Sequence, residues 1–168
     1  MEEYNWCVLC VKPRQTEHVI GKLAAREVEY FYPEVLAQRS IYRHPKLTPC
    51  FMGYLFVNLE GGNGQAGELR QLAGVRGWLT NEGRMVVIPN ALLAMVRQKM
   101  LEVNNKGGMT PADYAAESEA LLSADAKINP MAIFNPRLSG YQRLKMLVWV
   151  ALGAEVYFDP HTKEEPGI

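Results

Sequence analysis

Two cysteines near the start of the chain have the spacing of a metal or redox pair. Cys7 and Cys10 form a C-x-x-C motif in the stretch NWCVLCV. A structural zinc site needs four ligands, usually with a second pair at a set spacing. Only Cys50 remains, and no His pair accompanies it. On a strand, residues three apart also point to opposite faces. The motif therefore favours buried structural cysteines over a zinc site or a cysteine-based enzyme or sensor.

A glycine-rich stretch, GGNGQAG at Gly61–Gly67, is the next candidate for chemistry. It lacks the lysine that follows the glycines of a phosphate-binding P-loop, so a flexible surface loop is the better interpretation. The chain has no G-x-S-x-G and no H-E-x-x-H motif. His18, His44 and His161 are scattered, with no evident carboxylate or nucleophile partner in the sequence. We therefore expect no enzymatic activity, no cofactor and no metal.

A group of cations could bind nucleic acid. The basic residues at the first predicted strand–helix junction and along that helix are Lys12, Arg14, His18, Lys22 and Arg26. The last three are spaced by four and so share one helical face. Such a row can follow phosphates or contact base edges of single-stranded DNA. The alternative is a solvated face balanced by Glu17, Glu27 and Glu29, and charge alone leaves both open.

Two aromatic residues lie on one face of a predicted strand. In TPCFMGYLFVNL, Tyr54 and Phe56 point to one side and Leu55 and Val57 to the other. The aliphatic pair suits a core. The aromatic pair is either covered by helices of the same domain or kept for a partner, and the strand pattern does not choose between these.

The surrounding elements predict an α+β fold. The expected strands are Asn5–Val11, Val28–Tyr32, Phe51–Leu59, a strand near Trp78–Thr80, and Met85–Ile88. The expected helices are Glu17–Ala25 with Thr16 as its cap, a short piece at Glu68–Leu72, and a helix from Ala91 to about Val103. Pro33 ends the second strand, Gln38–Lys46 is an exposed loop or hairpin arm, and Asn81–Gly83 forms a hairpin turn. This order is a mixed sheet flanked by helices, close to the ferredoxin-like pattern.

The C-terminal third differs in character. Residues 104–112 contain the best linker, NNKGGMTP, which divides a domain of residues 1–103 from a module of residues 113–168. Asp113–Ile128 has a helical composition. Tyr141–Leu152 fits both a helical apolar stripe and an alternating strand face, so periodicity leaves its structure open.

Bulk composition excludes several classes of protein. The chain of 168 residues is 48% apolar, with 18 basic and 18 acidic residues, so its net charge does not indicate a nucleic-acid binder. It has no apolar run of membrane-spanning length and no signal-peptide pattern, and its three cysteines fit a reducing compartment. We expect a cytoplasmic monomer without a membrane partner.

Four stretches in order resemble one family. NWCVLCVKPRQTEHVIGKL, PCFMGYLFVNL, LAGVRGWL and VVIPNALL are similar to the N-terminal domain of the NusG family, and within it to the specialised branch of RfaH and its plasmid-carried relatives. The family pattern keeps an aromatic-rich P-x-F-P-x-Y-L-F-V strand. The chain departs from it at Cys7, where Tyr is usual, and at Met52, where Pro is usual.

The resemblance implies a transcription elongation or antitermination factor that reduces pausing and termination. In the family, the aromatic strand forms an apolar depression that binds the β′ clamp coiled coil of bacterial RNA polymerase. Carried onto this chain, the RNA polymerase-binding residues are Phe51, Met52, Tyr54, Phe56, Leu93 and Val96. The resemblance also implies that the basic residues named above contact non-template single-stranded DNA, and that the Gly61–Gly67 side faces the β gate loop.

The tail carries a weaker resemblance. AIFNPRLSGYQRLKMLVWVALGAEVYFDP is similar to the second half of the C-terminal KOW-type module of the RfaH branch. There the module folds as a helical hairpin over the depression in the closed form, with a KOW-like β-barrel as the alternative, and family tails can recruit a ribosomal protein. Ser123–Pro130 lacks the usual Gly-rich element, Ala73 replaces a DNA-contacting basic residue, and Gln65–Gly67 replaces the element that faces the gate loop.

An RRM-like RNA-binding module is the alternative function. MGYLFVNL partly matches the RNP1 strand, whose aromatic residues stack on bases. Met52, Leu55 and Leu59 disagree with that motif, and it does not account for Trp6, Lys12 and Gly74-Val75.

Overall fold

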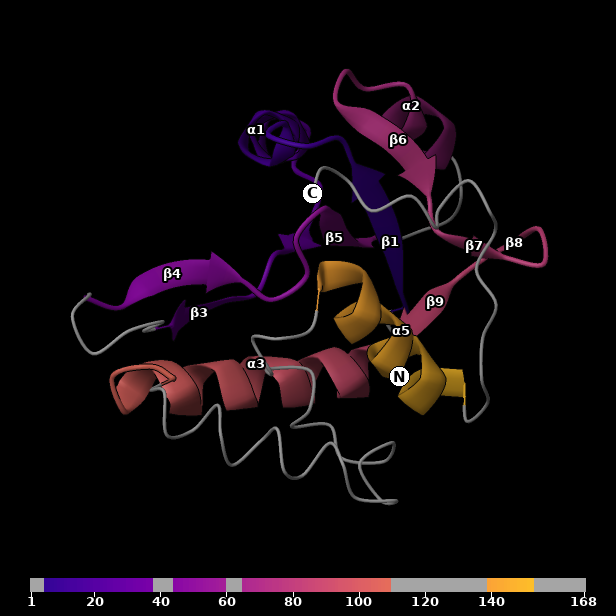
Figure 1. Ribbon diagram of the computed structural model, residues 1–168. Coiled ribbons are helices and arrows are strands. Elements are labelled where there is room, and N and C mark those ends of the chain that lie inside the picture. The colour runs from indigo at the N-terminus through magenta and orange to yellow at the C-terminus, as the bar shows by residue number, and fades with distance from the viewer. Residues whose placement is uncertain (1–4, 38–43, 60–64, 110–138, 153–168) are drawn as a thin grey trace.

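The computed structural model describes residues 5–37, 44–59, 65–109 and 139–152. Their main sheet is five-stranded and antiparallel, with helices on both faces (Figure 1). The central strand is β1 (Asn5–Val11), between β5 (Tyr54–Asn58) and β6 (Val75–Trp78). The strand β2 (Tyr30–Phe31) lies beyond β5, and β9 (Val87–Pro89) also pairs with β1. The predicted α+β class is therefore confirmed.

Two small hairpins extend from this sheet. One joins β3 (Glu34–Ala37) to β4 (Lys46–Pro49), where an exposed arm was expected but no strand at residues 34–37. The second strand ends before Pro33, as predicted, and a separate strand of another sheet begins directly after this proline. The Pro33 carbonyl accepts the Cys50 amide at 2.9 Å. The other joins β7 (Thr80–Asn81) to β8 (Arg84–Met85) through left-handed Glu82 and Gly83, which confirms the predicted turn.

Two helices cover the first face of the sheet, α1 (Thr16–Ala25) and α2 (Ala66–Arg70). Their buried residues pack on the aliphatic side of the strands; this aliphatic cluster includes Leu9, Val11, Val19, Leu23, Leu55, Val57 and Leu69. Thr16 was expected to cap α1, but Gln15 occupies the N-cap position. The Thr16 side chain instead hydrogen-bonds Tyr32, whose pKa burial raises to about 12.

The opposite face is covered by α3 (Asn90–Asn105) and α5 (Gly140–Leu152). Figure 1 shows α1 and α2 on one side of the sheet, with α3 and α5 on the other. Trp6 ties the start of α3 to β1 by donating its indole N–H to the Asn90 side chain at 3.0 Å. None of the helices in the described ranges is long and apolar enough to cross a membrane.

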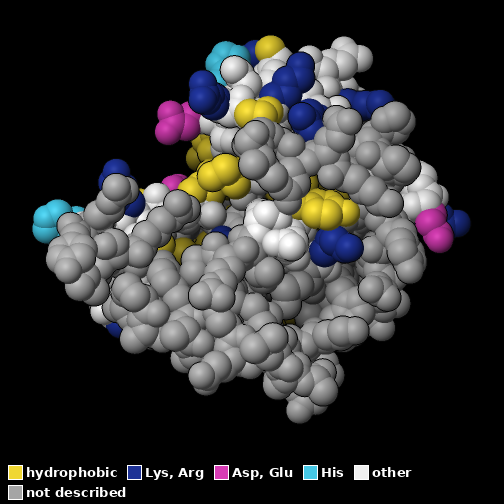
Figure 2. Space-filling model, viewed as in Figure 1, with side chains coloured by type: hydrophobic (Ala, Val, Ile, Leu, Met, Phe, Trp, Pro, Cys, Tyr) yellow, Lys and Arg dark blue, Asp and Glu magenta, His cyan; other side chains and the backbone are white. Residues whose placement is uncertain are grey.

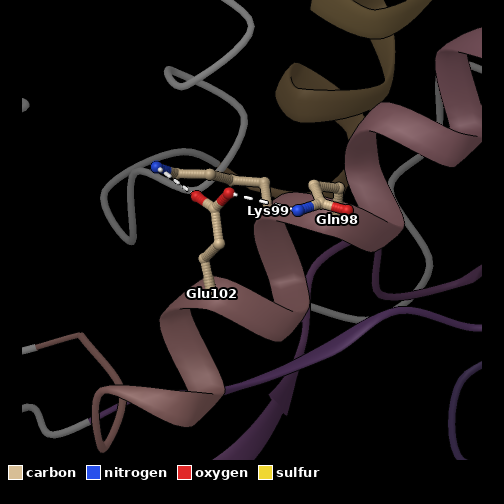
Figure 3. A network of polar contacts seen from close by, with 3 residues as sticks. All are labelled: Gln98, Lys99 and Glu102. Atoms are coloured by element: carbon tan, nitrogen blue, oxygen red, sulfur yellow. Dashed lines mark hydrogen bonds and ion pairs between the residues drawn. The ribbon is translucent and has the colours of Figure 1, made fainter.

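The outer side of α3 carries polar contacts beside the exposed side chains of Met95 and Leu101. Glu102 accepts hydrogen bonds from Gln98 at 3.5 Å and Lys99 at 3.4 Å, as Figure 3 shows. These i,i+3 and i,i+4 contacts support the helix at its exposed surface. The opposite side of α3, with Leu93 and Val96, is thereby turned toward the sheet.

The end of α3 is bound to the first hairpin. The helix continues to Asn105, past the expected end at Val103. Asn104 accepts the Leu36 amide at 2.8 Å and donates to the Glu34 carbonyl at 3.2 Å, and the Met109 amide donates to Leu36 at 2.8 Å. The first residues of the predicted linker therefore pack on β3. Its last residues, 110–112, and the predicted helix Asp113–Ile128 lie outside the described residues.

Tyr141–Leu152, whose apolar pattern fits both a helix and a strand, is helical and belongs to α5. Ser139 and Gln142 form a capping box at the start of α5, with the Gln142 amide donating to Ser139 Oγ at 3.1 Å and the Ser139 amide to Gln142 Oε1 at 2.9 Å. Such a box satisfies backbone donors that the first turn leaves free. This local signal favours the helix at a position where the apolar pattern fits both templates.

Candidate functional site

Strand β5 places the two aromatic side chains on the α3 side of the sheet. Tyr54 lies opposite Cys10 of β1, and Phe56 lies opposite Val8. These residues belong to one buried cluster, whereas Leu55 and Val57 belong to the aliphatic cluster on the other side. The predicted division of the strand into two faces is confirmed, and both faces are buried.

The rings around Phe56 pack at angles typical of aromatic clusters. Phe51 meets Phe56 edge to face, with ring centroids 5.3 Å apart and planes at 89°. Phe31 lies 6.3 Å from Phe56, and the Arg97 guanidinium is 4.7 Å from the centre of the Phe31 ring. A cation over an aromatic face adds a modest attraction. Arg97 therefore contributes to this site, although the sequence analysis did not single it out.

Five of the six residues predicted to bind RNA polymerase come together in this cluster. Their side chains are at most 3% exposed, and we call them the aromatic patch: Phe51, Tyr54, Phe56, Leu93 and Val96. The sixth, Met52, is 54% exposed and points away from the buried cluster. Its neighbours in the chain form the patch, but its side chain takes no part in it.

Helix α5 lies on the aromatic patch. Leu144 and Leu147 are 0% and 2% exposed and belong to the same cluster as the patch. They are three apart and so project from one side of the helix. The patch is therefore covered by residues far from it in the sequence.

Arg143 and Gly140 fix how α5 sits. The buried Arg143 guanidinium donates to the Cys50 carbonyl at 2.9 Å and to the Pro49 carbonyl at 3.5 Å. Gly140 lies against Met52 so closely that an added Cβ would be 2.7 Å from its backbone nitrogen and oxygen. Neither residue was predicted from the sequence. The signals were an arginine beside an apolar stripe and a glycine at the first position of a helix.

The cysteines are buried structural residues, as expected. Cys7 belongs to the aliphatic cluster and Cys10 to the aromatic one, so the C-x-x-C pair points to opposite faces. Burial raises the pKa of the Cys7 thiol, and it raises the pKa values of Cys10 and Cys50 to about 12. These thiols are neutral at physiological pH, which disfavours nucleophilic or metal-binding roles. The described residues contain no group of metal-ligating side chains.

The predicted DNA-binding residues lie at the opposite end of the molecule from α3. Lys12, Arg14, His18 and Arg26 are exposed and Lys22 is half-buried, and no described carboxylate forms an ion pair with any of the five. Figure 2 shows Lys and Arg side chains gathered over α1, α2 and β6. The acidic neighbours considered as a counterbalance do not pair with these cations in the described ranges.

Gly74 holds this basic end together. Its carbonyl accepts the Lys12 amide at 2.7 Å, which joins the turn after β1 to the start of β6. An added Cβ would lie 2.9 Å from the Cβ of Gln15, and its φ of +95° also favours glycine. Nearby Ala73, Gln65 and Gly67 are exposed, whereas residues 61–64 lie outside the described ranges.

Comparison with protein families decides the relationship. The model of the family described as "Transcription termination factor nusG" matches residues 4–97. This chain belongs to the NusG family. A comparison with curated proteins found no match.

Membership of the NusG family makes the chain a transcription factor of the elongation and termination class that binds RNA polymerase. It agrees with a non-enzymatic role. The burial of Tyr54 and Phe56 weighs against the RRM-like alternative, because stacking of bases on these rings requires an open sheet face.

Proposed function

We propose that this NusG-family protein is an antitermination factor of the RfaH type, which binds the β′ clamp coiled coil of bacterial RNA polymerase through the aromatic patch. The observation that carries the proposal is the convergence of Phe51, Tyr54 and Phe56 with two α3 residues in one apolar cluster. Full burial of one such side chain contributes roughly 1.5–3 kcal/mol. A few clustered rings are therefore enough for an interaction hot spot.

Helix α5 acts as a lid in this proposal. Its residues Leu144 and Leu147 occupy the patch, so the coiled coil must displace them before it binds. The apparent affinity is then reduced by the fraction of molecules in which the lid is open. The first half of the predicted helical hairpin, Asp113–Ile128, lies outside the described ranges. The KOW-like β-barrel would require α5 to leave its helical form and remains part of the proposal.

The basic end would contact non-template single-stranded DNA. Lys12, Arg14, His18, Lys22 and Arg26 lie away from the lid, so DNA and the coiled coil would occupy separate surfaces. The accessible cations support backbone contacts, which weaken as salt increases. DNA would recruit the factor to particular transcription complexes.

The proposed factor bridges the DNA channel. With the aromatic patch on β′ and the Gly61–Gly67 side toward the β gate loop, it would bind the closed clamp better than the paused state. Each tenfold difference in affinity shifts that equilibrium by about 1.4 kcal/mol. The C-terminal module would be free to recruit a ribosomal protein once released.

A capture experiment with a steric wedge tests the lid and the patch together. Gly140→Ala adds a Cβ against the Met52 backbone while raising helix propensity, so it disfavours docking of α5 without disfavouring the helix. We expect this variant to bind a recombinant β′ coiled-coil fragment more tightly than the wild type. Adding Tyr54→Ala and Phe56→Ala to it should abolish capture.

Gly21→Ala is the matched control, because Gly21 lies within α1 and an added Cβ meets nothing within 4 Å. It should leave capture unchanged. Circular dichroism checks that the aromatic double variant is folded, and Val96→Ala provides a milder change to the patch if it is not. Capture that is indifferent to all patch substitutions in folded variants would reject the proposed site.

A further inference from the structure

Helix α5 lies on a surface that we call the seat, which consists of the Pro49 and Cys50 carbonyls, the Met52 backbone and the aromatic patch. The two carbonyls are polar acceptors within an otherwise apolar surface. The carbonyl groups of Pro49 and Cys50 both accept hydrogen bonds from the Arg143 side chain, and Cys50 is 0% exposed. Among the described residues, Arg143 is the donor that reaches the Cys50 carbonyl. These acceptors belong to the last residue of β4 and the first residue after it, directly before Phe51 of the aromatic patch. They remain on the sheet whether or not α5 is present.

The lid contacts this seat through one helical face. Gly140 lies against the Met52 backbone, Arg143 binds the two carbonyls, and Leu144 and Leu147 enter the cluster. The offsets from Gly140 are three, four and seven residues, which is one face of an α-helix. The seat thus accepts a small residue, a cation and two leucines in that order.

A carboxylate belongs to the hairpin that carries the acceptors of Arg143, because Glu34 of β3 is the register partner of Pro49. The Glu34 carboxylate of β3 lies near enough to Cys50 to raise the pKa of its thiol, whereas Arg143 lowers it. Glu34 is half-buried, and no described cation forms an ion pair with it. Glu34 is paired with Pro49 in the β3–β4 hairpin, so its negative charge belongs to the same segment as the carbonyls that bind the guanidinium.

These contacts impose a requirement on any helix that replaces α5. A buried acceptor left without a donor costs about 1–3 kcal/mol. A purely apolar helix that excluded water from the seat would leave the Cys50 carbonyl in that state. A helix that presents an Arg or Lys beside its apolar residues would satisfy it.

We propose that the aromatic patch selects a partner helix that places an Arg or Lys on the Pro49 and Cys50 carbonyls, three residues after a small residue and just before the apolar residues that enter the patch. This inference rests on the proposed function, since it names the chemistry of the helix that binds the same site. It makes the lid a mimic of its competitor: both use a cation to recognise the same backbone acceptors.

The test uses the full-length Gly140→Ala protein and a recombinant β′ coiled-coil fragment in which each exposed Arg and Lys is changed singly to Gln. One variant of the fragment should lose about tenfold or more in affinity, because hydrogen bonds from charged groups are worth more than neutral ones. The other variants should lose only the small amount typical of exposed charges.

A double-mutant cycle locates the sensitive cation. Glu34→Gln should weaken capture of the unmodified fragment, and it should have little further effect on the fragment that lacks that cation. Glu68→Gln on the exposed surface of α2 is the matched control and should change neither.

The two proposals fail in different ways. If neither Gly140→Ala nor a second opened variant, Arg143→Gln, captures the unmodified fragment, the proposed function fails. If capture depends on Tyr54 and Phe56 but every Arg and Lys variant of the fragment binds equally, the proposed function stands and the cation requirement is overturned. A sensitive cation that shows no coupling to Glu34 would also overturn it.

Discussion

The two faces of the sheet are covered in different ways. The aliphatic face, with Leu9, Leu55 and Val57, lies under α1 and α2, which are connected to neighbouring strands by short stretches of chain. The aromatic face, with Tyr54 and Phe56, lies under α3 and also under α5, which begins at Gly140. Both sets of side chains are almost fully buried.

Equal burial of the two faces therefore does not mean that their covering helices are equally hard to remove. Uncovering the aliphatic face would separate α1 from β1 and break the core of the family domain. Among the described elements, α5 can leave the aromatic patch with loss of its leucine contacts and of the hydrogen bonds of Arg143, and no paired strands need to separate. Local openings of this kind have lower free energies than global unfolding. The comparison predicts different responses to substitutions on the two faces.

The largest effect is expected from leucine truncation. Leu55→Ala on the aliphatic face should lower the free energy of unfolding of the sheet by about 2–5 kcal/mol. Leu144→Ala should weaken docking of α5 by a similar mechanism but change the stability of the sheet much less. Urea unfolding combined with hydrogen exchange of the β1 amides separates the two. Equal loss of β1 protection in both variants would show that α5 is an integral part of the core.

The sequence predicted the sheet better than its cover. Alternation in Tyr54–Val57 correctly assigned opposite faces, because the strand period is two regardless of what packs on it. The same pattern could not tell whether the aromatic side is covered by α3, by α5 or by a partner. The identity of the covering element depends on contacts between residues far apart in the sequence. The apolar residues of α3 and of α5 are both suitable for it.

Polar contacts within the apolar site were the hardest to predict. Leu93 and Val96 follow from helical spacing, whereas the bonds from Arg143 to the Pro49 and Cys50 carbonyls depend on the tertiary position of a backbone segment. Met52 was expected with the patch because of its place in the motif. The turn before β5, with Gly53 at a φ of 90°, instead leaves its side chain exposed.

The next effect concerns Arg143. Arg143→Gln should weaken docking of α5 by about 1.5–3 kcal/mol, because it removes a charged donor from two carbonyls. Hydrogen exchange at the α5 amides should accelerate accordingly, while the β1 amides keep their protection. Arg97→Gln is the control, since Arg97 is an exposed cation over Phe31 and should cost about 0.5–1 kcal/mol. Faster exchange of α5 after Arg97→Gln than after Arg143→Gln would contradict the assigned anchor.

A pH effect should distinguish thiols on the two faces. Below pH 9 the thiols are neutral in both states; above it the unfolded state ionises first, because the folded pKa values of Cys10 and Cys50 are raised from 9.0 to about 12. The free energy of unfolding should therefore fall between pH 9 and 12, by up to about 1.4 kcal/mol per pH unit for each thiol.

Single Cys→Ala variants assign this slope. Cys10→Ala and Cys50→Ala, on the aromatic side, should flatten the alkaline decrease in stability more than Cys7→Ala does. The reason is that burial raises the pKa of the Cys7 thiol less than those of the other two. Urea titrations at several pH values measure it. An alkaline slope that responds most to Cys7→Ala would reverse the expected order.

The smallest expected effect comes from the start of α5. Of the described helices, α1, α2 and α3 have no side-chain bond at their N-caps, whereas Ser139 and Gln142 form a reciprocal pair at the start of α5. Helices packed into a permanent core are held by tertiary contacts, and a removable lid depends more on its own local signals. Ser139→Ala should therefore cost α5 about 1 kcal/mol, and Ser139→Thr much less.

The matched control is Gln15→Ala at the N-cap of α1, which keeps the Cβ beside Gly74 and should have almost no effect. Hydrogen exchange at Leu144 and Leu147 should accelerate about fivefold for Ser139→Ala, the factor that corresponds to this free energy. If those amides exchange at the wild-type rate in Ser139→Ala, α5 is held by packing in the same way as α1, and the distinction between the two faces does not extend to their helices.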